Sequence, residues 1–100
     1  MQIYFERSGG FMGRIEKAEI DTDSLSVEEA QEIQNIINTA NFFTLPEAML
    51  NLKGADQFTY NLTIETTDSK HSIKVGDTSA PESLQPLLRK LTRMARKKIN

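Results

Sequence analysis

Three glycines lie within five residues near the start of the chain, in the run Ser8-Gly9-Gly10-Phe11-Met12-Gly13. Glycine reaches positive φ angles without steric cost, so such a run is typical of a turn with an unusual backbone shape. Ile3 and Phe5 precede it with the alternation of a strand, and Ile15 follows it. We therefore predict a hairpin in which the second strand runs from about Met12 to Ile20. Ile15 and Ile20 differ in parity, which we explain by a bulge in that strand.

A second hairpin is predicted further along the chain. From Gln57 to Glu65, apolar and polar residues alternate strictly, and His71 to Val75 repeats the pattern after a turn at 67–69. Between the two hairpins lies a long connector, Thr44 to Asp56, with a short turn expected at 46–50.

Two helices complete the pattern. Apolar residues from Val27 to Ala40 follow a helical period and form one buried stripe, and Ser26 with Glu29 predicts a capping box at its start. Phe42 and Phe43 are expected to plug the core beneath its last turn. A leucine-rich helix ends the chain, and Ser79 with Glu82 is spaced as a second capping box.

Pro86 interrupts the start of that last helix. It must either kink the helix or mark its first turn, because proline lacks the backbone N–H that a helix interior needs. We therefore place the helix from about Leu87 onward.

The order ββαββα predicts an α+β fold with two layers. We expect a four-stranded, mainly antiparallel sheet with two helices on one face. A chain of 100 residues supports one core, so residues 1–100 are predicted to form a single domain.

Composition argues against catalytic or metal chemistry. There is no cysteine, and His71 is the only histidine, so a zinc site or a nucleophile–histidine pair lacks its usual ligands and partners. We predict a structural role for His71, no catalytic residues, no bound metal and no cofactor. The chain has neither a secretory leader nor a run of about 20 apolar residues that could span a membrane, and the missing cysteines favour a cytoplasmic location.

Charge is distributed unevenly along the chain. All 14 acidic residues lie at or before Glu82, together with six of the 12 basic ones, so residues 1–82 carry a net charge of −8. The remaining six basic residues gather on the last helix. This cluster has two interpretations. In the first, the cations are simply solvated and stabilised by the dipole at the C-terminal end of the helix. Alternatively, they form a basic helix that binds nucleic acid or an anionic surface. We favour the first interpretation, because this segment lacks aromatic residues for stacking on bases.

A short polar segment precedes the first helix. Asp21-Thr22-Asp23-Ser24-Leu25-Ser26 combines small polar residues with one apolar side chain, an arrangement that can offer Leu25 to a cleft in a partner. Alternatively, Leu25 is half of a hydrophobic staple against Ala30, and the serines are helix caps.

Three segments, in this order and followed by a leucine-rich helix, resemble the emfourin-like family: Phe5 to Gly13, Ala40 to Pro46, and Asp56 to Ile64. The resemblance covers nearly the whole chain. The namesake of the family is an inhibitor of protealysin, a thermolysin-like zinc metalloprotease. The resemblance thus implies a bacterial, cytoplasmic protease inhibitor rather than an enzyme, with a protealysin-type protease as its partner and no nucleic acid or membrane. We expect it to act as a monomer.

From residue chemistry, we predict that the segment around Leu25 enters the cleft of the protease. Leu25 would fill the apolar pocket, and Asp23 or Glu28 would approach the zinc ion or its polar neighbours. The predicted contact residues are Asp23, Ser24, Leu25, Ser26 and Glu28. Two other loops remain alternatives, namely Ser8 to Gly13 with Phe11 as anchor and Thr44 to Asp56 with Leu45. An adaptor that binds nucleic acid or an anionic surface through the basic last helix is the alternative function.

Overall fold

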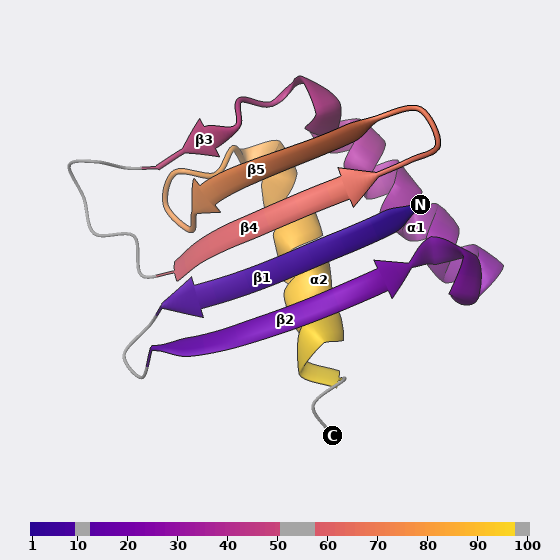
Figure 1. The fold of residues 1–100 in the computed structure, drawn as a ribbon, viewed down its shortest axis with the longest axis horizontal. Helices are drawn as coiled ribbons and strands as arrows, with labels where there is room; N and C mark the ends of the chain where they lie inside the picture. Colours follow the sequence, from indigo (N-terminus) through magenta and orange to yellow (C-terminus); the bar gives the residue numbers. More distant parts are fainter. Residues whose placement is uncertain (10–12, 51–57, 98–100) are drawn as a thin grey trace.

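The computed structural model describes residues 1–9, 13–50 and 58–97, which form one mixed sheet and two main helices (Figure 1). The strands are β1 (Gln2–Gly9), β2 (Arg14–Asp21), β3 (Ala48–Met49), β4 (Phe58–Glu65) and β5 (Lys70–Gly76). The α-helices are α1 (Val27–Ala40) and α2 (Gln85–Lys97), and the 3-10 turns are η1 (Thr22–Ser24), η2 (Phe42–Thr44) and η3 (Glu82–Leu84).

The strands lie in the order β2-β1-β4-β5-β3, and all neighbours are antiparallel except β3, which pairs with β5 in parallel. The α+β class is therefore confirmed, but the prediction of four strands was wrong. The fifth strand, β3, occupies the connector where we predicted a turn at 46–50. Main-chain bonding to β5 explains the difference, since the N–H of Lys74 donates to the carbonyl of Glu47 at 2.8 Å.

The glycine-rich run joins β1 to β2, as predicted. Gly9 and Gly13 have φ angles of 110° and 63°, which other residues rarely adopt. Residues 10–12 lie outside the described residues. The predicted bulge was wrong, because the register runs unbroken from Gly9↔Arg14 to Gln2↔Asp21. Ile15 simply points to the uncovered face of the sheet, where 60% of its surface is exposed.

Both α-helices lie on the same face of the sheet, behind the strands in Figure 1. The core between the layers is apolar because strand alternation turns one set of side chains toward the helices. It includes Ile3, Phe5, Ala18, Ile20, Leu62, Ile64, Ile73 and Val75 from the sheet, and Ile33, Ile37, Leu84, Leu87, Leu88, Leu91 and Ala95 from the helical segments. Phe42 plugs this core as predicted, whereas Phe43 is 39% exposed.

Helix α1 begins and ends where the sequence predicts. The hydroxyl of Ser26 accepts a hydrogen bond from the N–H of Glu29 at 3.1 Å, and Asn41 closes the helix in the left-handed conformation. One residue of the predicted stripe was misplaced. Val27 is 78% exposed, because it occupies the first helical position, before the helix reaches the core.

Helix α2 begins at Gln85, two residues earlier than predicted, and Pro86 lies in its first turn. That position suits proline, since the first N–H groups of a helix have no partner within it. The predicted capping box at Ser79 and Glu82 was wrong. Pro81 precedes η3, and the hydroxyl of Ser79 donates instead to the carbonyl of Met49 at 2.6 Å.

Candidate functional site

The segment from the last residue of β2 to the first turn of α1, residues 21–28, is held by its own hydrogen bonds. We call it the acidic connector. The carboxylate of Asp21 accepts from the N–H of Asp23 at 3.0 Å, and the hydroxyl of Ser24 donates to the carbonyl of Asp21 at 2.8 Å. The N–H of Thr22 also donates to the carbonyl of Met1 at 3.0 Å. Because these bonds form the η1 turn and fasten it to the first residue, the connector has a defined shape before any partner binds.

Leu25 lies on the inner side of this connector. It is half-buried and packs against the core, at a hollow of about 290 Å³ between the connector, α1 and α2. We call this the connector hollow. Its lining residues are Glu19, Ile20, Asp21, Ser24, Leu25, Glu29, Lys90, Arg93 and Met94. The inward position of Leu25 agrees with the staple alternative, so its contact with a protease stays a prediction.

The other four predicted contact residues face solvent. Asp23, Ser24, Ser26 and Glu28 are all exposed, and Ser26 also caps α1. Sequence reasoning missed a fifth residue beside them. Val27 is the most exposed of the large apolar residues in the described part of the chain, at 78%. The helical period concealed it, because that pattern places Val27 on the buried stripe. The structure thus gathers two exposed carboxylates, two hydroxyls and one apolar side chain on one short segment.

The two alternative loops differ in how much of them the structure describes. Phe11, the proposed anchor of the first, lies outside the described residues, as do residues 51–56 of the second. In the described part of the second, Leu45 packs against the core, and its carbonyl accepts a hydrogen bond of 2.7 Å from Nε2 of His71. The ring of His71 also meets that of Phe42 edge-on, with centroids 5.4 Å apart. These contacts support the structural role predicted for His71 and bind Leu45 to the fold.

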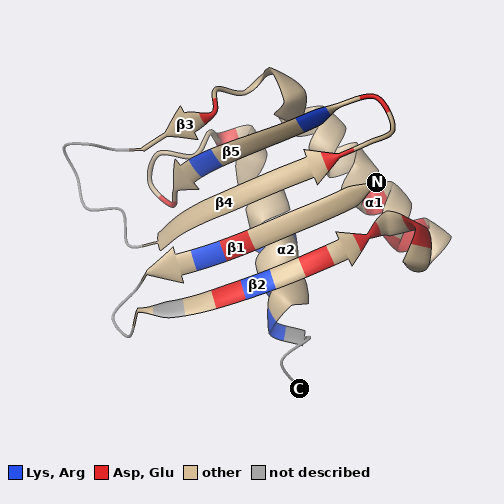
Figure 2. Cartoon of the chain, in the orientation of Figure 1, with Lys and Arg blue, Asp and Glu red and all other residues tan. Residues whose placement is uncertain are grey.

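The basic residues of α2 partly serve the fold itself. Lys90 approaches Glu29 and Glu32 of α1 at 3.3 and 3.5 Å, and its side chain is only 17% exposed. Arg96 donates from Nε to Glu16 of β2 at 3.1 Å. Acidic residues gather on β2 and around the start of α1, and basic ones at the end of α2 (Figure 2). Folding therefore pairs part of the charge that the sequence separates, which counts against a helix fully available to a nucleic acid.

Within the described ranges, no group of three or more His, Cys, Asp or Glu side chains is placed to hold a metal ion. Neither helix, over the residues that the structure describes, is long and apolar enough to cross a bilayer.

The fold and this surface define a small two-layer α+β protein that displays a preformed polar connector. The chain belongs to the Emfourin family, whose model matches residues 5–92 and which is a family of inhibitors. Comparison with curated proteins and with solved structures found no match. The family match confirms the resemblance drawn from the sequence.

Proposed function

We propose that this protein inhibits a thermolysin-like zinc metalloprotease of the protealysin type, and that the acidic connector enters the active-site cleft. Membership of the Emfourin family supports inhibition. The observation that carries the choice of segment is the set of hydrogen bonds around Asp21, which holds the connector in shape. A segment ordered in advance loses little conformational entropy on binding, and so binds more tightly for a given contact area.

The side chains of the connector suit such a cleft in two ways. Asp23 and Glu28 are exposed carboxylates, and carboxylate oxygen is a ligand that Zn²⁺ accepts. For the apolar pocket there are two candidates, namely the half-buried Leu25 and the exposed Val27. We propose that Ser24 and Ser26 hydrogen-bond to the rim of the cleft.

The proposal extends to the whole chain. Residues 1–100 act as one emfourin-like domain, as a monomer in the bacterial cytoplasm, without a cofactor and without chemistry of their own. The close pairing of α2 with both α1 and β2 supports a single unit, since Lys90 and Arg96 join elements that are distant in the sequence.

Inhibition of a protealysin-type protease by the full chain and its variants tests the proposal. We expect the parent to inhibit, and Leu25→Ala and Val27→Ala each to raise the inhibition constant, one of them by about tenfold or more, as for an anchor residue. Ile15→Ala is the control, because Ile15 is also a large apolar residue with an exposed side chain, but it lies on the uncovered face of the sheet. Thermal unfolding of each variant shows that the fold is kept.

Three results would contradict parts of this proposal. A parent chain without effect on the protease would remove the function itself. Two folded variants that inhibit as well as the parent would exclude the acidic connector. A comparable loss with Ile15→Ala would move the contact to the uncovered sheet face.

A further inference from the structure

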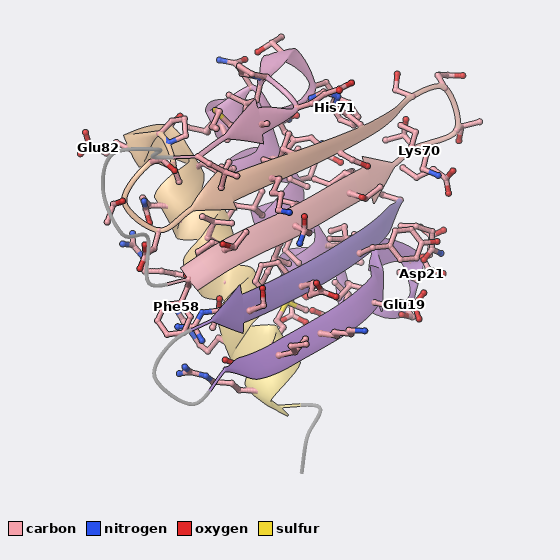
Figure 3. The ribbon with its side chains drawn as sticks, turned by 60° about the vertical axis from the view of Figure 1, so that its left-hand side comes forward. Glu19, Asp21, Phe58, Lys70, His71 and Glu82 are labelled. Carbon is pink, nitrogen blue, oxygen red and sulfur yellow. The ribbon has the colours of Figure 1, made fainter. Side chains whose placement is uncertain are left out.

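A second hollow lies on the other side of α2, between that helix and the strands β1 and β4. Its volume is also about 290 Å³, and we call it the arginine hollow. Its lining residues are Arg7, Tyr60, Gln85, Leu88, Arg89, Thr92, Arg93 and Arg96. Half of these residues are arginines and none is acidic. Phe58, which lies against the Arg7 guanidinium, is at the end of the sheet opposite to Glu19 and Asp21 (Figure 3). Arg93 lines both hollows, so the two meet at α2.

Arg7 lines this hollow with a side chain that is held in place by its contacts. Strand alternation turns it to the same face as Ile3 and Phe5, and its side chain is only 13% exposed. Its guanidinium lies 3.6 Å from the centroid of the Phe58 ring and pairs with the carboxylate of Glu16. Burial lowers the pKa of Arg7, but its hydrogen bonds and charge interactions with Tyr60 and Glu16 outweigh burial and leave that pKa raised. Arg7 is therefore a permanent, positioned cation.

Tyr60 provides a donor at the same place. Its hydroxyl oxygen accepts a hydrogen bond from Nε of Arg7 at 3.3 Å, so its own proton is available for an acceptor. No residue in the described part of the chain accepts that proton. Tyr60 is 9% exposed, and its side chain reaches the hollow from β4.

The remaining arginines leave an excess of positive charge. Arg89 and Arg93 are four residues apart on α2, so they share one face, and neither pairs with a carboxylate of the described residues. Arg96 pairs with Glu16, the same carboxylate that pairs with Arg7. Four guanidinium groups thus face one carboxylate, and guanidinium groups bind phosphate oxygens in a fixed, often bidentate geometry.

We propose that the arginine hollow binds a phosphate group, either as inorganic phosphate or as the monoester of a small molecule. Arg89 and Arg93 hold two of its oxygens, and the hydroxyl of Tyr60 donates to a third. Arg7 is held beneath it and adds charge. The proposal does not rest on the acidic connector or on protease inhibition, although Arg93 also lines the connector hollow.

Titration of the full chain with inorganic phosphate, followed by NMR of backbone and arginine N–H groups, tests the proposal. Ionic strength is kept constant with chloride, because screening would otherwise change during the titration. We expect saturable shifts around 88–93, with a dissociation constant on the order of 1 mM. The double variant R89Q/R93Q is expected to weaken binding by about tenfold or more. K70Q/K74Q, which removes two exposed charges from β5, is expected to leave binding unchanged.

Phenyl phosphate serves as the second probe and distinguishes the source of the group. Equal affinity for both probes points to the free ion, and tighter binding of phenyl phosphate points to a small-molecule ester. Three results would overturn the site: shifts that do not saturate, an equal loss in K70Q/K74Q, or wild-type affinity in R89Q/R93Q. Preferential binding of a single-stranded oligonucleotide, with a steep salt dependence, would replace it with a nucleic-acid surface.

Discussion

The two hollows beside α2 have equal volumes of about 290 Å³ but opposite electrostatic character. In the connector hollow, three carboxylates from Glu19, Asp21 and Glu29 face two cations. In the arginine hollow, four arginines line the surface, and none of the described lining residues is acidic. Arg93 borders both. The comparison shows that acidic and basic side chains face each other on one side of α2, whereas positive charge is in excess on the other side.

The difference follows from which helix face meets α1. Lys90 and Met94 lie on the side of α2 that meets the acidic connector and α1, where Glu29 and Glu32 are in reach. Arg89 and Arg96 line the opposite hollow, where Glu16 is the carboxylate that the described residues offer. Adjacent residues point in different directions around a helix, so Lys90 meets carboxylates of α1 while its neighbour Arg89 does not.

The largest effect is expected from a truncation in the core of α2, the helix that lines both hollows. Leu91 is fully buried in α2, so Leu91→Ala is expected to lower the free energy of unfolding by about 2–5 kcal/mol and to loosen both hollows. Urea unfolding measures the change. Thr92→Ala, the next residue on the same helix, is the control. A loss below about 1 kcal/mol would show that α2 contributes less to the core than its burial indicates.

Removing the Glu16 carboxylate should increase the excess of positive charge at the arginine hollow and so the difference between the two hollows. The side chain of Glu16 is 12% exposed, and Glu16→Gln leaves Arg7 without its counter-charge, at an expected cost of about 1–3 kcal/mol in unfolding free energy. The same change should strengthen phosphate binding, because the cations then attract only the ligand. Urea unfolding and the phosphate titration measure both effects.

Glu6→Gln is the matched control for that change. Glu6 pairs with Lys17 at 3.6 Å, but the lysine side chain is 71% exposed, so the expected loss is under about 0.5 kcal/mol. Equal effects of the two substitutions would mean that burial of Arg7 adds nothing to its pairing with Glu16.

Of the changes at the two hollows, the smallest is expected on the connector side. Lys90→Gln removes the cation shared by Glu29 and Glu32, and the expected loss of unfolding free energy is about 0.5–1 kcal/mol. Because the pair is partly exposed, added salt should reduce the difference between parent and variant. A difference that salt leaves unchanged would assign the loss to packing of the Lys90 side chain instead of its charge.

Local patterns predicted the elements of this fold well. The alternation from Phe58 to Glu65, the period from residue 27 to 40 and the glycines around β1 and β2 each correspond to an observed element. Pro86 marked the first turn of α2. These features succeed because they depend on neighbours within a few residues.

Features that depend on distant contacts could not be predicted in the same way. The strand β3 is two residues long and exists through its pairing with β5, far along the chain. Val27 carries the right period but lies before the core begins. Lys90 is 61 residues from Glu29, and Arg7 is 53 from Tyr60, so neither hollow has a local signature. Sequence did indicate the acidic connector, because its small polar residues lie next to one another.

The position of β2 at the margin of the sheet has a consequence for the protein at high concentration. Among the described residues, no strand pairs with its outer backbone groups, whereas the opposite margin is formed by the two-residue strand β3. Glu16 on its inner face and Lys17 and Glu19 on its outer face place a charge at nearly every central position. Another chain that docked there in an amyloid-like manner would have to strip water from these charges. The charges of β2 thereby disfavour edge-to-edge aggregation at a margin that no other described strand covers.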